Sequence, residues 1–471
     1  MTFNSFTFVL FFLVVLGLYQ LPLPWRTRKG ILLCSSYLFY AAWNPPFVGL
    51  LVVSTVVDWV AGKRIYASSG TPRRAWLVLS LCTNLGILAY FKYSPFLLQS
   101  FAELAAGVGI VFEPATAGIV LPIGISFYTF QTLSYSIDIY RKRLSPATSF
   151  LDYALFVTFF PQLVAGPIVR ASEFLPQCLQ PKRVDGCQIG WGFILLTLGL
   201  FQKTILADHL FAPVADAIYR EPERVSFATA WLGTLAFSGQ IFFDFAGYSS
   251  CAIGAALCLG FVLPDNFRYP YAAIGFSDFW RRWHISLSSW LRDYLYIPLG
   301  GNRHGRFNQA GSLMLTMLIG GLWHGASWTF VVWGGLHGLY LVAERIAKAT
   351  VGHLALWRHH AMQIALALLT FLLVTMTWVF FRAPDFTSAS LFLQAMFGGA
   401  EQMSPVGPQA YVALAAVCMT LVFQWKMRQS SIEEVTERLP RWTVALCIGL
   451  LLVIMAITHQ EETRGFIYFQ F

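Results

Sequence analysis

The sequence predicts an all-α protein that crosses a membrane many times, on the strength of its composition and its hydropathy pattern. Of the 471 residues, 57% are hydrophobic and 12% are charged, whereas roughly 25% of the residues of an average soluble domain are charged. A helix needs about 20 apolar residues to cross a bilayer. Long runs without Asp, Glu, Lys or Arg recur along the chain: Thr2–Trp25, Gly30–Val57, Pro114–Ile137, Val225–Phe243, Phe245–Pro264, Phe307–Ala343, His359–Phe381, Gln402–Trp425 and Trp442–Gln460.

No internal repeat, low-complexity segment or soluble domain interrupts this pattern. We therefore expect a single integral membrane domain over residues 1–471, with roughly 10–12 spanning helices and additional re-entrant or interfacial helices. The first hydrophobic run lacks a preceding basic region and an obvious small-residue cleavage site. It is therefore interpreted as a retained helix rather than a secretory signal peptide.

Basic loops alternate with poorly charged loops in the first third of the chain. Lys and Arg gather in Arg26–Lys29, Lys63–Arg74 and Arg141–Arg143, whereas Asn44–Pro46 and Glu103–Glu113 carry little positive charge. Loops rich in Lys and Arg stay in the cytoplasm. Counting from the first basic loop, we expect the N-terminus to lie outside the cytoplasm.

The middle of the chain is less regular. Phe160-Pro161 and Gly166-Pro167 interrupt a segment that is short for a span, which is typical of a broken or re-entrant helix surrounded by protein. Asp244 lies between two charge-free runs. Two interpretations stay open for it: a structural carboxylate satisfied by neighbouring hydroxyls or Arg, or a residue that lines a polar cavity.

The segment Asp278–Leu299 has the composition of an interfacial helix, although a helix buried against the bundle also fits. Its aromatic residues suit the headgroup level, its arginines suit phosphates or an anionic cofactor, and Gly300-Gly301 ends it. The aromatic residues are Trp280, Trp283, Trp290, Tyr294 and Tyr296, and the arginines are Arg281, Arg282 and Arg292.

Two histidines are the main candidates for chemistry. His324 lies inside a long run without formal charge, and an ionisable residue in such a run indicates a functional site. Gly320-Gly321 and Gly325 around it permit close backbone approach, and Trp323 is suited to the wall of a narrow tunnel. His284 lies in the charged, Trp-rich segment upstream. His337 is interpreted as a packing residue.

Several other classes of protein lack support in the sequence. A P-loop, GxGxxG, GxSxG and HExxH are all absent, and no metal site is predicted because no CxxC or zinc-like spacing occurs. The net charge of +9 fits cytoplasmic basic loops rather than nucleic-acid binding. The cysteines are scattered, at Cys34, Cys82, Cys178, Cys187, Cys251, Cys258, Cys418 and Cys447.

Five separated motifs resemble those of the membrane-bound O-acyltransferases, in the expected order over nearly the whole chain. They are PQLVAGPIVR, QIFFDFAGYSS, FSDFWRRWHISLSSWLRDYLYIPLGGNRHG, GLWHGASWTFVVWGGLHG and the terminal FIYFQF. More narrowly, they resemble the bacterial branch that contains the alginate O-acetylation and teichoic-acid D-alanylation membrane subunits. The resemblance implies a ring of helices around a central tunnel. It also implies that His324, in the WHG motif, is catalytic and that His284, in the RWH motif, lies near it.

The resemblance further implies transfer of an acyl group from a cytoplasmic thioester to a hydroxyl on the outer face. His324 is the expected general base, because imidazole is poised near neutral pH. His284 is expected either to orient it or to donate to the carbonyl oxygen. Further candidates for lining the tunnel or binding substrate are Trp323, Asp244, Arg282, Trp283 and Asp293.

The substrates and partners are expected by the same resemblance. The acyl group is expected to be acetyl, carried by acetyl-CoA or by the thioester of an acyl-carrier protein, with no cofactor bound. The acceptor is expected to be a secreted polysaccharide such as alginate, reached through a periplasmic SGNH-type acetyltransferase and a polysaccharide export complex. The expected location is the bacterial inner membrane, with a periplasmic N-terminus.

The aromatic C-terminus has two interpretations. Glu461–Phe471 is expected on the periplasmic side, with Phe466, Tyr468, Phe469 and Phe471 near the outer mouth of the tunnel. Aromatic tails commonly anchor a helix end at the interface. Alternatively, Tyr468 receives the acyl group and relays it, as is thought for similar tails in the D-alanylation systems that the sequence resembles.

Two other classes of function remain as alternatives. An acyl or polysaccharide transporter is also polytopic, but it tends to show a repeated half, which this sequence lacks. A scaffold subunit without its own chemistry has no reason to keep His324 in an apolar run.

Overall fold

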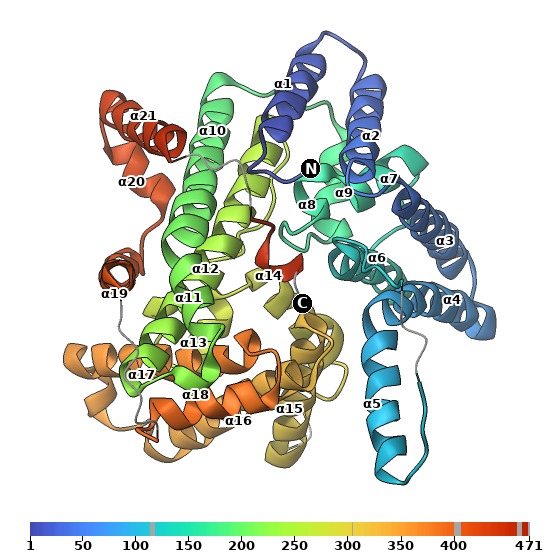
Figure 1. Ribbon diagram of the computed structural model, residues 1–471. Coiled ribbons are helices and arrows are strands. Elements are labelled where there is room, and N and C mark those ends of the chain that lie inside the picture. The colour runs from blue at the N-terminus through green and yellow to red at the C-terminus, as the bar shows by residue number, and fades with distance from the viewer. Residues whose placement is uncertain (114–117, 304, 400–406, 459–463, 470–471) are drawn as a thin grey trace. The chain divides into compact units, whose positions relative to one another are not determined.

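The computed structural model describes residues 1–113, 118–303, 305–399, 407–458 and 464–469. In this part of the chain every regular element is a helix and no strand occurs (Figure 1). Among the described residues, six helical segments are long and apolar enough to cross a membrane: Pro45–Ala67, Gly70–Gly107, Gly186–Tyr219, Phe227–Cys258, His360–Arg382 and Pro408–Met427. The prediction of a polytopic all-α membrane protein is confirmed. The higher number of spans, the ring and the tunnel stay predictions.

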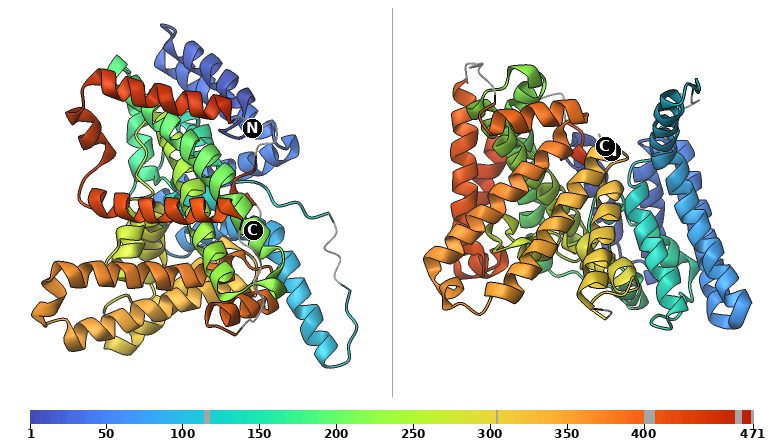
Figure 2. Two further views of the ribbon diagram at one scale, coloured as in Figure 1. Left: turned by 60° about the vertical axis from the view of Figure 1, so that its left-hand side comes forward. Right: turned by 90° about the horizontal axis from the view of Figure 1, so that it is seen from below.

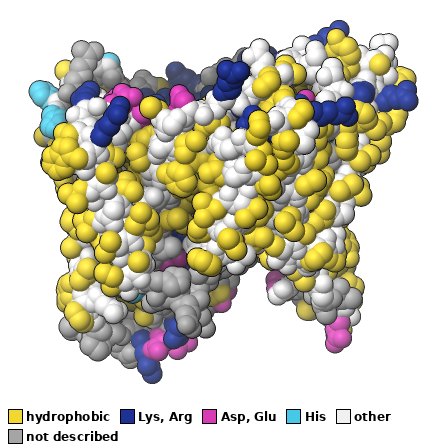
Figure 3. Space-filling view, turned by 90° about the horizontal axis from the view of Figure 1, so that it is seen from above, with side chains coloured by type: hydrophobic (Ala, Val, Ile, Leu, Met, Phe, Trp, Pro, Cys, Tyr) yellow, Lys and Arg dark blue, Asp and Glu magenta, His cyan; other side chains and the backbone are white. Residues whose placement is uncertain are grey.

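The surface fits this class of protein. Large hydrophobic side chains of the spanning helices remain exposed, among them Val52, Leu85, Leu368 and Val422, and Figure 3 shows hydrophobic side chains spread over much of one face. A water-soluble monomer rarely exposes apolar patches larger than a few hundred Å², whereas lipid solvates such a surface.

The chain divides into two compact units. The first comprises Met1–Leu196 and Cys251–Pro264; the single integral membrane domain stays a prediction. Its helices are α1 (Phe6–Gln20), α2 (Trp25–Ala41), η1 (Pro45–Phe47), α3 (Val48–Ala67), α4 (Gly70–Leu88), η2 (Ala89–Tyr93), α5 (Ser94–Gly107), α6 (Ile125–Tyr140), α7 (Phe150–Thr158), α8 (Phe160–Leu163), α9 (Ala171–Leu179) and α10 (Gly186–Phe201), whose last residues belong to the second unit.

The first unit contains the expected helix break. α7 ends at Thr158 and the short α8 begins at Phe160, with Pro161 in its first turn. Proline is tolerated at this position because the N–H groups in the first turn of a helix have no intrahelical partner, so the missing N–H of proline costs no hydrogen bond. The irregular backbone from Phe159 to Val169 is buried, so protein rather than lipid surrounds it, as such a break requires.

The second unit comprises Thr197–Ser250 and Asp265–Phe471. Its elements are η3 (Gln202–Phe211), α11 (Ala212–Tyr219), η4 (Pro222–Arg224), α12 (Phe227–Cys258, whose end belongs to the first unit), η5 (Pro270–Ala272), α13 (Phe276–Arg282), α14 (Ile285–Leu291), η6 (Arg292–Tyr296), α15 (Gly305–His324), α16 (Trp328–Val351), η7 (Ala355–Arg358), α17 (His360–Arg382), α18 (Phe386–Met396), α19 (Pro408–Met427), α20 (Ile432–Arg438), α21 (Arg441–Ile457) and η8 (Ile467–Phe469). The short α20 connects α19 to α21 (Figure 2).

α15 and α16 form a tight antiparallel hairpin. A Cβ atom on Gly321 would lie 2.3 Å from the carbonyl oxygen of Phe330, and one on Gly334 would lie 2.2 Å from that of Met317. Only glycine permits backbones to approach this closely. The crossing therefore fixes the end of α15, where His324 lies.

The segment Asp278–Leu299 is not the single interfacial helix that its composition favours, but two short α-helices followed by a π-helical turn. The interruption falls at Trp283-His284, where both side chains are fully buried. The alternative of packing against the bundle therefore holds for this part. Gly300 and Gly301 end the segment with φ values of 114° and 52°, as the sequence predicts.

Candidate active site

His324 is the last residue of α15 and lies in a cage of aromatic rings. Only 2% of the residue is exposed. The ring centroids of Trp333 and Trp323 lie 5.0 Å and 5.1 Å from that of the imidazole, and those of Tyr468 and Phe381 lie 5.5 Å and 5.7 Å away. The C-terminal end of a helix stabilises a positive charge by about 0.3–1 kcal/mol. This is the charge that a general base acquires.

His284 lies beside His324, with 6.2 Å between the two ring centroids. It is fully buried, and Phe245 packs edge-on against its ring at 4.6 Å. Its φ of 43° is left-handed, a conformation that costs a residue with a side chain about 1–2 kcal/mol. Such strain persists where the surrounding structure enforces it, and it clusters at functional sites. The break between α13 and α14 thus places the imidazole in the interior, beside His324.

The amide of Asn266 determines which nitrogen of His284 carries the proton. The backbone N–H of Ser286 and its hydroxyl donate to Oδ1 of Asn266 at 3.3 Å and 2.9 Å, and Nδ2 of Asn266 donates to the hydroxyl of Ser249 at 3.1 Å. Nδ1 of His284 lies 3.0 Å from the same Oδ1. Because that oxygen only accepts, Nδ1 carries the proton and Nε2 of a neutral ring is an acceptor.

Burial keeps this ring neutral. Removal from water lowers the pKa of His284 to about 3, because burial disfavours the charged form. A neutral ring with an acceptor at Nε2 fits the first of the two predicted roles, orientation of His324. Donation to a carbonyl oxygen would require the protonated ring.

The C-terminal segment enters the same site. Phe466 and Ile467 are buried, with 1% and 3% of each residue exposed. The ring of Tyr468 contacts those of Phe245, Phe466 and Phe381 at centroid distances of 4.7 Å, 5.2 Å and 5.9 Å. Phe466 and Ile467 therefore lie in the interior, whereas Arg464 and Gly465 are exposed. Residues 459–463 and 470–471, including Phe471, lie outside the described residues.

Asp244 takes part in a buried ion pair behind this segment. Its carboxylate lies 2.6 Å from Nζ of Lys203, which also lies 2.8 Å from Asp208. Lys203 and Asp208 share a face because η3 is a π-helix, in which residues five apart are neighbours. The partner of Asp244 is thus a lysine, and neither the hydroxyls nor the Arg that the structural interpretation predicted.

The structure brings together some predicted site residues and separates others. Trp323 contacts His324 and also lies 5.9 Å from His284, centroid to centroid. Trp283 packs behind them, 5.2 Å from Trp378. The two polar candidates besides Asp244 have structural partners: Arg282 pairs with Asp278 at 3.0 Å, and Asp293 pairs with Arg292 at 2.7 Å.

His337 has a structural contact, as its interpretation as a packing residue requires. It is fully buried, and its Nε2 lies 3.0 Å from the hydroxyl of Thr377. That hydroxyl donates to the carbonyl of Val374 at 2.7 Å, so it accepts from His337 and fixes the ring.

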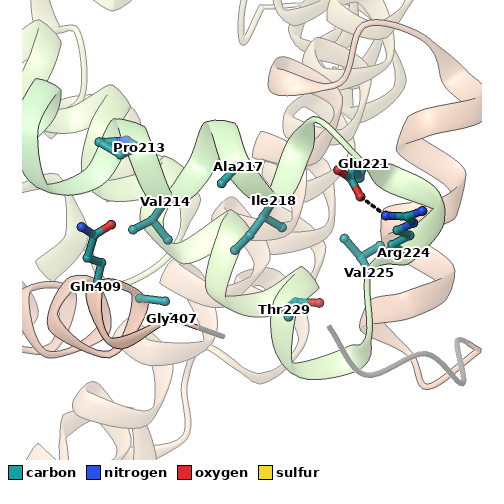
Figure 4. A pocket seen from close by; sticks show the side chains of 11 residues that line it. Pro213, Val214, Ala217, Ile218, Glu221, Arg224, Val225, Thr229, Gly407 and Gln409 are labelled. Carbon is teal, nitrogen blue, oxygen red and sulfur yellow. Dashed lines mark hydrogen bonds and ion pairs between the residues drawn. The ribbon is translucent and has the colours of Figure 1, made fainter. Parts of the chain in front are cut away.

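A pocket of about 330 Å³ lies elsewhere in the second unit, between α11, α12 and the start of α19 (Figure 4). Val214, Ile218 and Val225 give it apolar walls, and Glu221 and Arg224 pair at its rim with 3.0 Å between them. Its described lining includes none of the predicted site residues. That lining offers no acid–base group beyond the exposed ion pair, so we assign the pocket no catalytic role.

Residues 139–383 match the model of the membrane-bound O-acyltransferase family. The matched stretch contains both buried histidines of the cage, together with Lys203, Asp244 and Asn266. This chain belongs to that family. It is an O-acyltransferase.

Relatives of this acyltransferase act with different acyl groups. The chain is 42% identical to a probable alginate O-acetylase of Azotobacter vinelandii, over 84% of this chain and 78% of that protein. It is 40% identical to a peptidoglycan O-acetyltransferase of Helicobacter pylori, over 78% of this chain and 73% of that protein. A teichoic acid D-alanyltransferase of Bacillus subtilis is 26% identical over 65% of this chain and 86% of its own length.

Proposed function

We propose that this acyltransferase moves an acetyl group from a cytoplasmic thioester across the bacterial inner membrane, for O-acetylation of a secreted polysaccharide. The observation that carries the proposal is the aromatic cage, in which a buried imidazole, His324, lies 5.5 Å ring to ring from a phenol, Tyr468. Relatives at about 40% identity are named for acetylation of alginate and of peptidoglycan, so a polysaccharide is the shared class of acceptor.

His324 acts as the general base on the attacking hydroxyl. As it removes the proton, the oxygen attacks the carbonyl carbon of the thioester, a new acyl–oxygen bond forms and the acyl–sulfur bond breaks. The thiol leaves with the proton that His324 took up, so the base is regenerated. A positioned base of this kind contributes about 10²–10⁴-fold to the rate.

Tyr468 is the first acceptor in this proposal. A phenol in water has a pKa of about 10, far below that of a sugar alcohol, so an aryl ester is a good acyl donor for a second transfer. In that step a sugar hydroxyl takes the acyl group and the phenol recovers its proton. Burial raises the pKa of the Tyr468 phenol while it lies in the cage. The place of the ring beside His324 supports relay over anchoring at an interface.

The donor, the partners and the orientation follow from the same proposal. The donor is acetyl-CoA or an acyl-carrier-protein thioester, whose acidic groups suit the basic loops that we place in the cytoplasm, such as Arg141–Arg143. A periplasmic SGNH-type transferase and an export complex complete the transfer to the polymer. The N-terminus is then periplasmic.

The test is acyl transfer by the purified full-length protein and by its His324→Gln variant. The wild type should release thiol from acetyl thioester and form an acetyl ester, and the variant should lose about 10²–10⁴-fold of that rate at unchanged thermal stability. A transporter or a scaffold subunit would show no thiol release from either protein. Equal rates in the two proteins would remove His324 from the mechanism.

A further inference from the structure

The backbone of the C-terminal segment is bonded to a buried ion pair. Nζ of Lys203 donates to the carbonyl oxygen of Gly465 at 3.1 Å. The backbone N–H of Ile467 donates to the second carboxylate oxygen of Asp244 at 2.7 Å. The lysine and the aspartate pair with each other at 2.6 Å, so the two charges and the two peptide groups form one closed arrangement.

The charges of this pair are expensive to bury. Lys203 and Asp244 keep only 5% and 3% of their side chains exposed, and both lie in helices long and apolar enough to span a membrane. Removing an ion from water costs several kcal/mol unless partners satisfy it. The tail supplies one of the acceptors of the lysine and one of the donors to the aspartate. Without the tail, the ammonium of Lys203 and the carboxylate of Asp244 would each lose one hydrogen-bond partner.

A second contact holds the tail one residue before Gly465. The guanidinium of Arg464 pairs with one carboxylate oxygen of Asp216, and that of Arg382 lies 2.8 Å from the other. These three side chains are more exposed than the Lys203–Asp244 pair. The segment is thus held by side-chain contacts at Arg464 and by backbone hydrogen bonds at Gly465 and Ile467, just before the tyrosine.

We propose that Lys203 and Asp244 form a docking site for the backbone of the C-terminal segment and are positioning residues that hold Tyr468 at His324. The positioning role rests on the proposed relay through Tyr468. The docking of the tail on Lys203 and Asp244 does not depend on that relay. Asp244 binds the N–H of Ile467, the residue immediately before Tyr468. Asp244 therefore sets the position of the phenol through one peptide unit, without touching the reacting atoms.

Asp208 provides a matched control. It contacts the same lysine at 2.8 Å, but the backbone hydrogen bonds of Gly465 and Ile467 run to Lys203 and Asp244. Asp244→Asn and Asp208→Asn each remove one negative charge beside Lys203. Only Asp244→Asn also weakens the hydrogen bond from the N–H of Ile467. A difference between the two variants in the position of the tail therefore reports the docking rather than the lost charge.

The position of the tail is measured by cross-linking in the full-length protein, in a background without the native cysteines. Phe381→Cys is combined with Tyr468→Cys, because the two side chains contact each other, with 5.9 Å between ring centroids. The yield of cross-linking by a short bis-maleimide, whose linker tolerates a wider range of backbone separations than a disulfide does, is read by mass spectrometry. Asp244→Asn should lower the yield by roughly tenfold or more, the effect of losing a charge-assisted hydrogen bond. Asp208→Asn should leave it within about twofold, because at the tail it removes only a charge interaction with Arg464 and breaks none of the backbone hydrogen bonds of Gly465 and Ile467.

Two further variants separate docking from folding. The double variant Lys203→Met/Asp244→Leu removes both charges together, which usually spares stability, and it should still lose the cross-link. Lys203→Arg keeps the charge and should retain part of the cross-link. Thermal unfolding in detergent reports folding for each variant.

The outcomes decide the proposal. An unchanged cross-link in both Asp244→Asn and the double variant overturns the docking site, as does an equal loss in Asp208→Asn. The acetyl adduct at Tyr468 is measured separately, in proteins that keep the tyrosine. No adduct in a wild type whose tail is docked overturns the relay, and with it the positioning role. A normal adduct in Asp244→Asn overturns the positioning role alone.

Discussion

At the scale of single residues, the site depends on how protons are placed on its two histidines. The amide of Asn266 accepts a hydrogen bond from Nδ1 of His284 and so leaves Nε2 as the acceptor nitrogen of that ring. The pair resembles the arrangement in which a buried group orients a functional histidine by accepting from its second nitrogen. Asn266 is thus a positioning residue that contacts no substrate in this scheme.

Replacing Asn266 tests this role through the pH dependence of the rate. Asn266→Leu removes the acceptor and should lower acyl transfer by about 10–100-fold, the cost typical of losing the hydrogen-bond partner that orients a metal-bound histidine. Asn266→Asp keeps the acceptor and should recover most of the rate at high pH. Its negative charge raises the pKa of His284 above the wild-type value of about 3. As the pH falls through that raised pKa, His284 becomes charged, its Nε2 stops accepting and the rate should fall.

The measurement is the initial rate from about pH 5 to pH 8, the range in which histidines titrate. In the wild type, titration of His284 should cause no change of rate between these pH values, since the pKa of His284 lies below them. A wild-type rate in Asn266→Leu, or identical profiles for the wild type and Asn266→Asp, would contradict the assignment.

Tyr468→Phe tests the relay with the smallest possible change, since it keeps the ring and removes the oxygen. The aromatic contacts to Phe245 and Phe466 should hold the ring in place, so folding should be unaffected. In cells with the Tyr468→Phe variant, we expect the exported polymer to lose its acetyl groups. In cells that keep the unmutated enzyme but lack the periplasmic partner, we expect an acetyl adduct at Tyr468. Full polymer acetylation by Tyr468→Phe would leave direct transfer to a separate acceptor.

At the scale of helices, the crossing of α15 and α16 holds His324 in place. Gly334→Ala inserts a methyl group 2.2 Å from the carbonyl oxygen of Met317, which must push the two helices apart. Overpacking of this kind costs about 1–3 kcal/mol. Because His324 ends α15 and packs against Trp333 of α16, the separation also displaces the imidazole from its aromatic cage.

Gly335→Ala is the matched control at the neighbouring position. Its added methyl group meets only Cδ2 of Leu318 at 3.4 Å, an ordinary contact. Thermal unfolding in detergent should show a lower midpoint for Gly334→Ala than for Gly335→Ala, with acyl transfer lost in the first and kept in the second. Similar midpoints and rates for the two variants would show that the crossing is not critical.

Some features of these helices could be predicted from the sequence and others could not. Hydropathy predicted the class of fold, and the glycines beside His324 predicted a close approach. The break at Trp283-His284 was missed, because a left-handed histidine depends on tertiary contacts that a local pattern does not contain. Lys203 was a detectable signal, a lone lysine in an apolar helix, which usually marks a functional site. Asn266 lies in an irregular segment and had no such signal.

At the scale of the whole molecule, orientation in the membrane decides which side supplies the thioester. The alternating loop charges predict that Lys63–Arg74 lies in the cytoplasm and Glu103–Glu113 in the periplasm. Both tested positions, Arg64 and Glu113, are exposed, so reagent access to each depends on the side of the membrane rather than on burial.

Labelling of single cysteines from outside intact cells measures this orientation. Cys34, Cys82 and Cys187 are exposed, as are Cys418 and Cys447, so the background must first lose its native cysteines. A thiol reagent that cannot cross the membrane should then label Glu113→Cys in intact cells and Arg64→Cys only after the membrane is opened. The opposite pattern would place the basic loops outside. It would also put the acidic thioester donor on the side away from those loops, which contradicts the direction of transfer proposed for this enzyme.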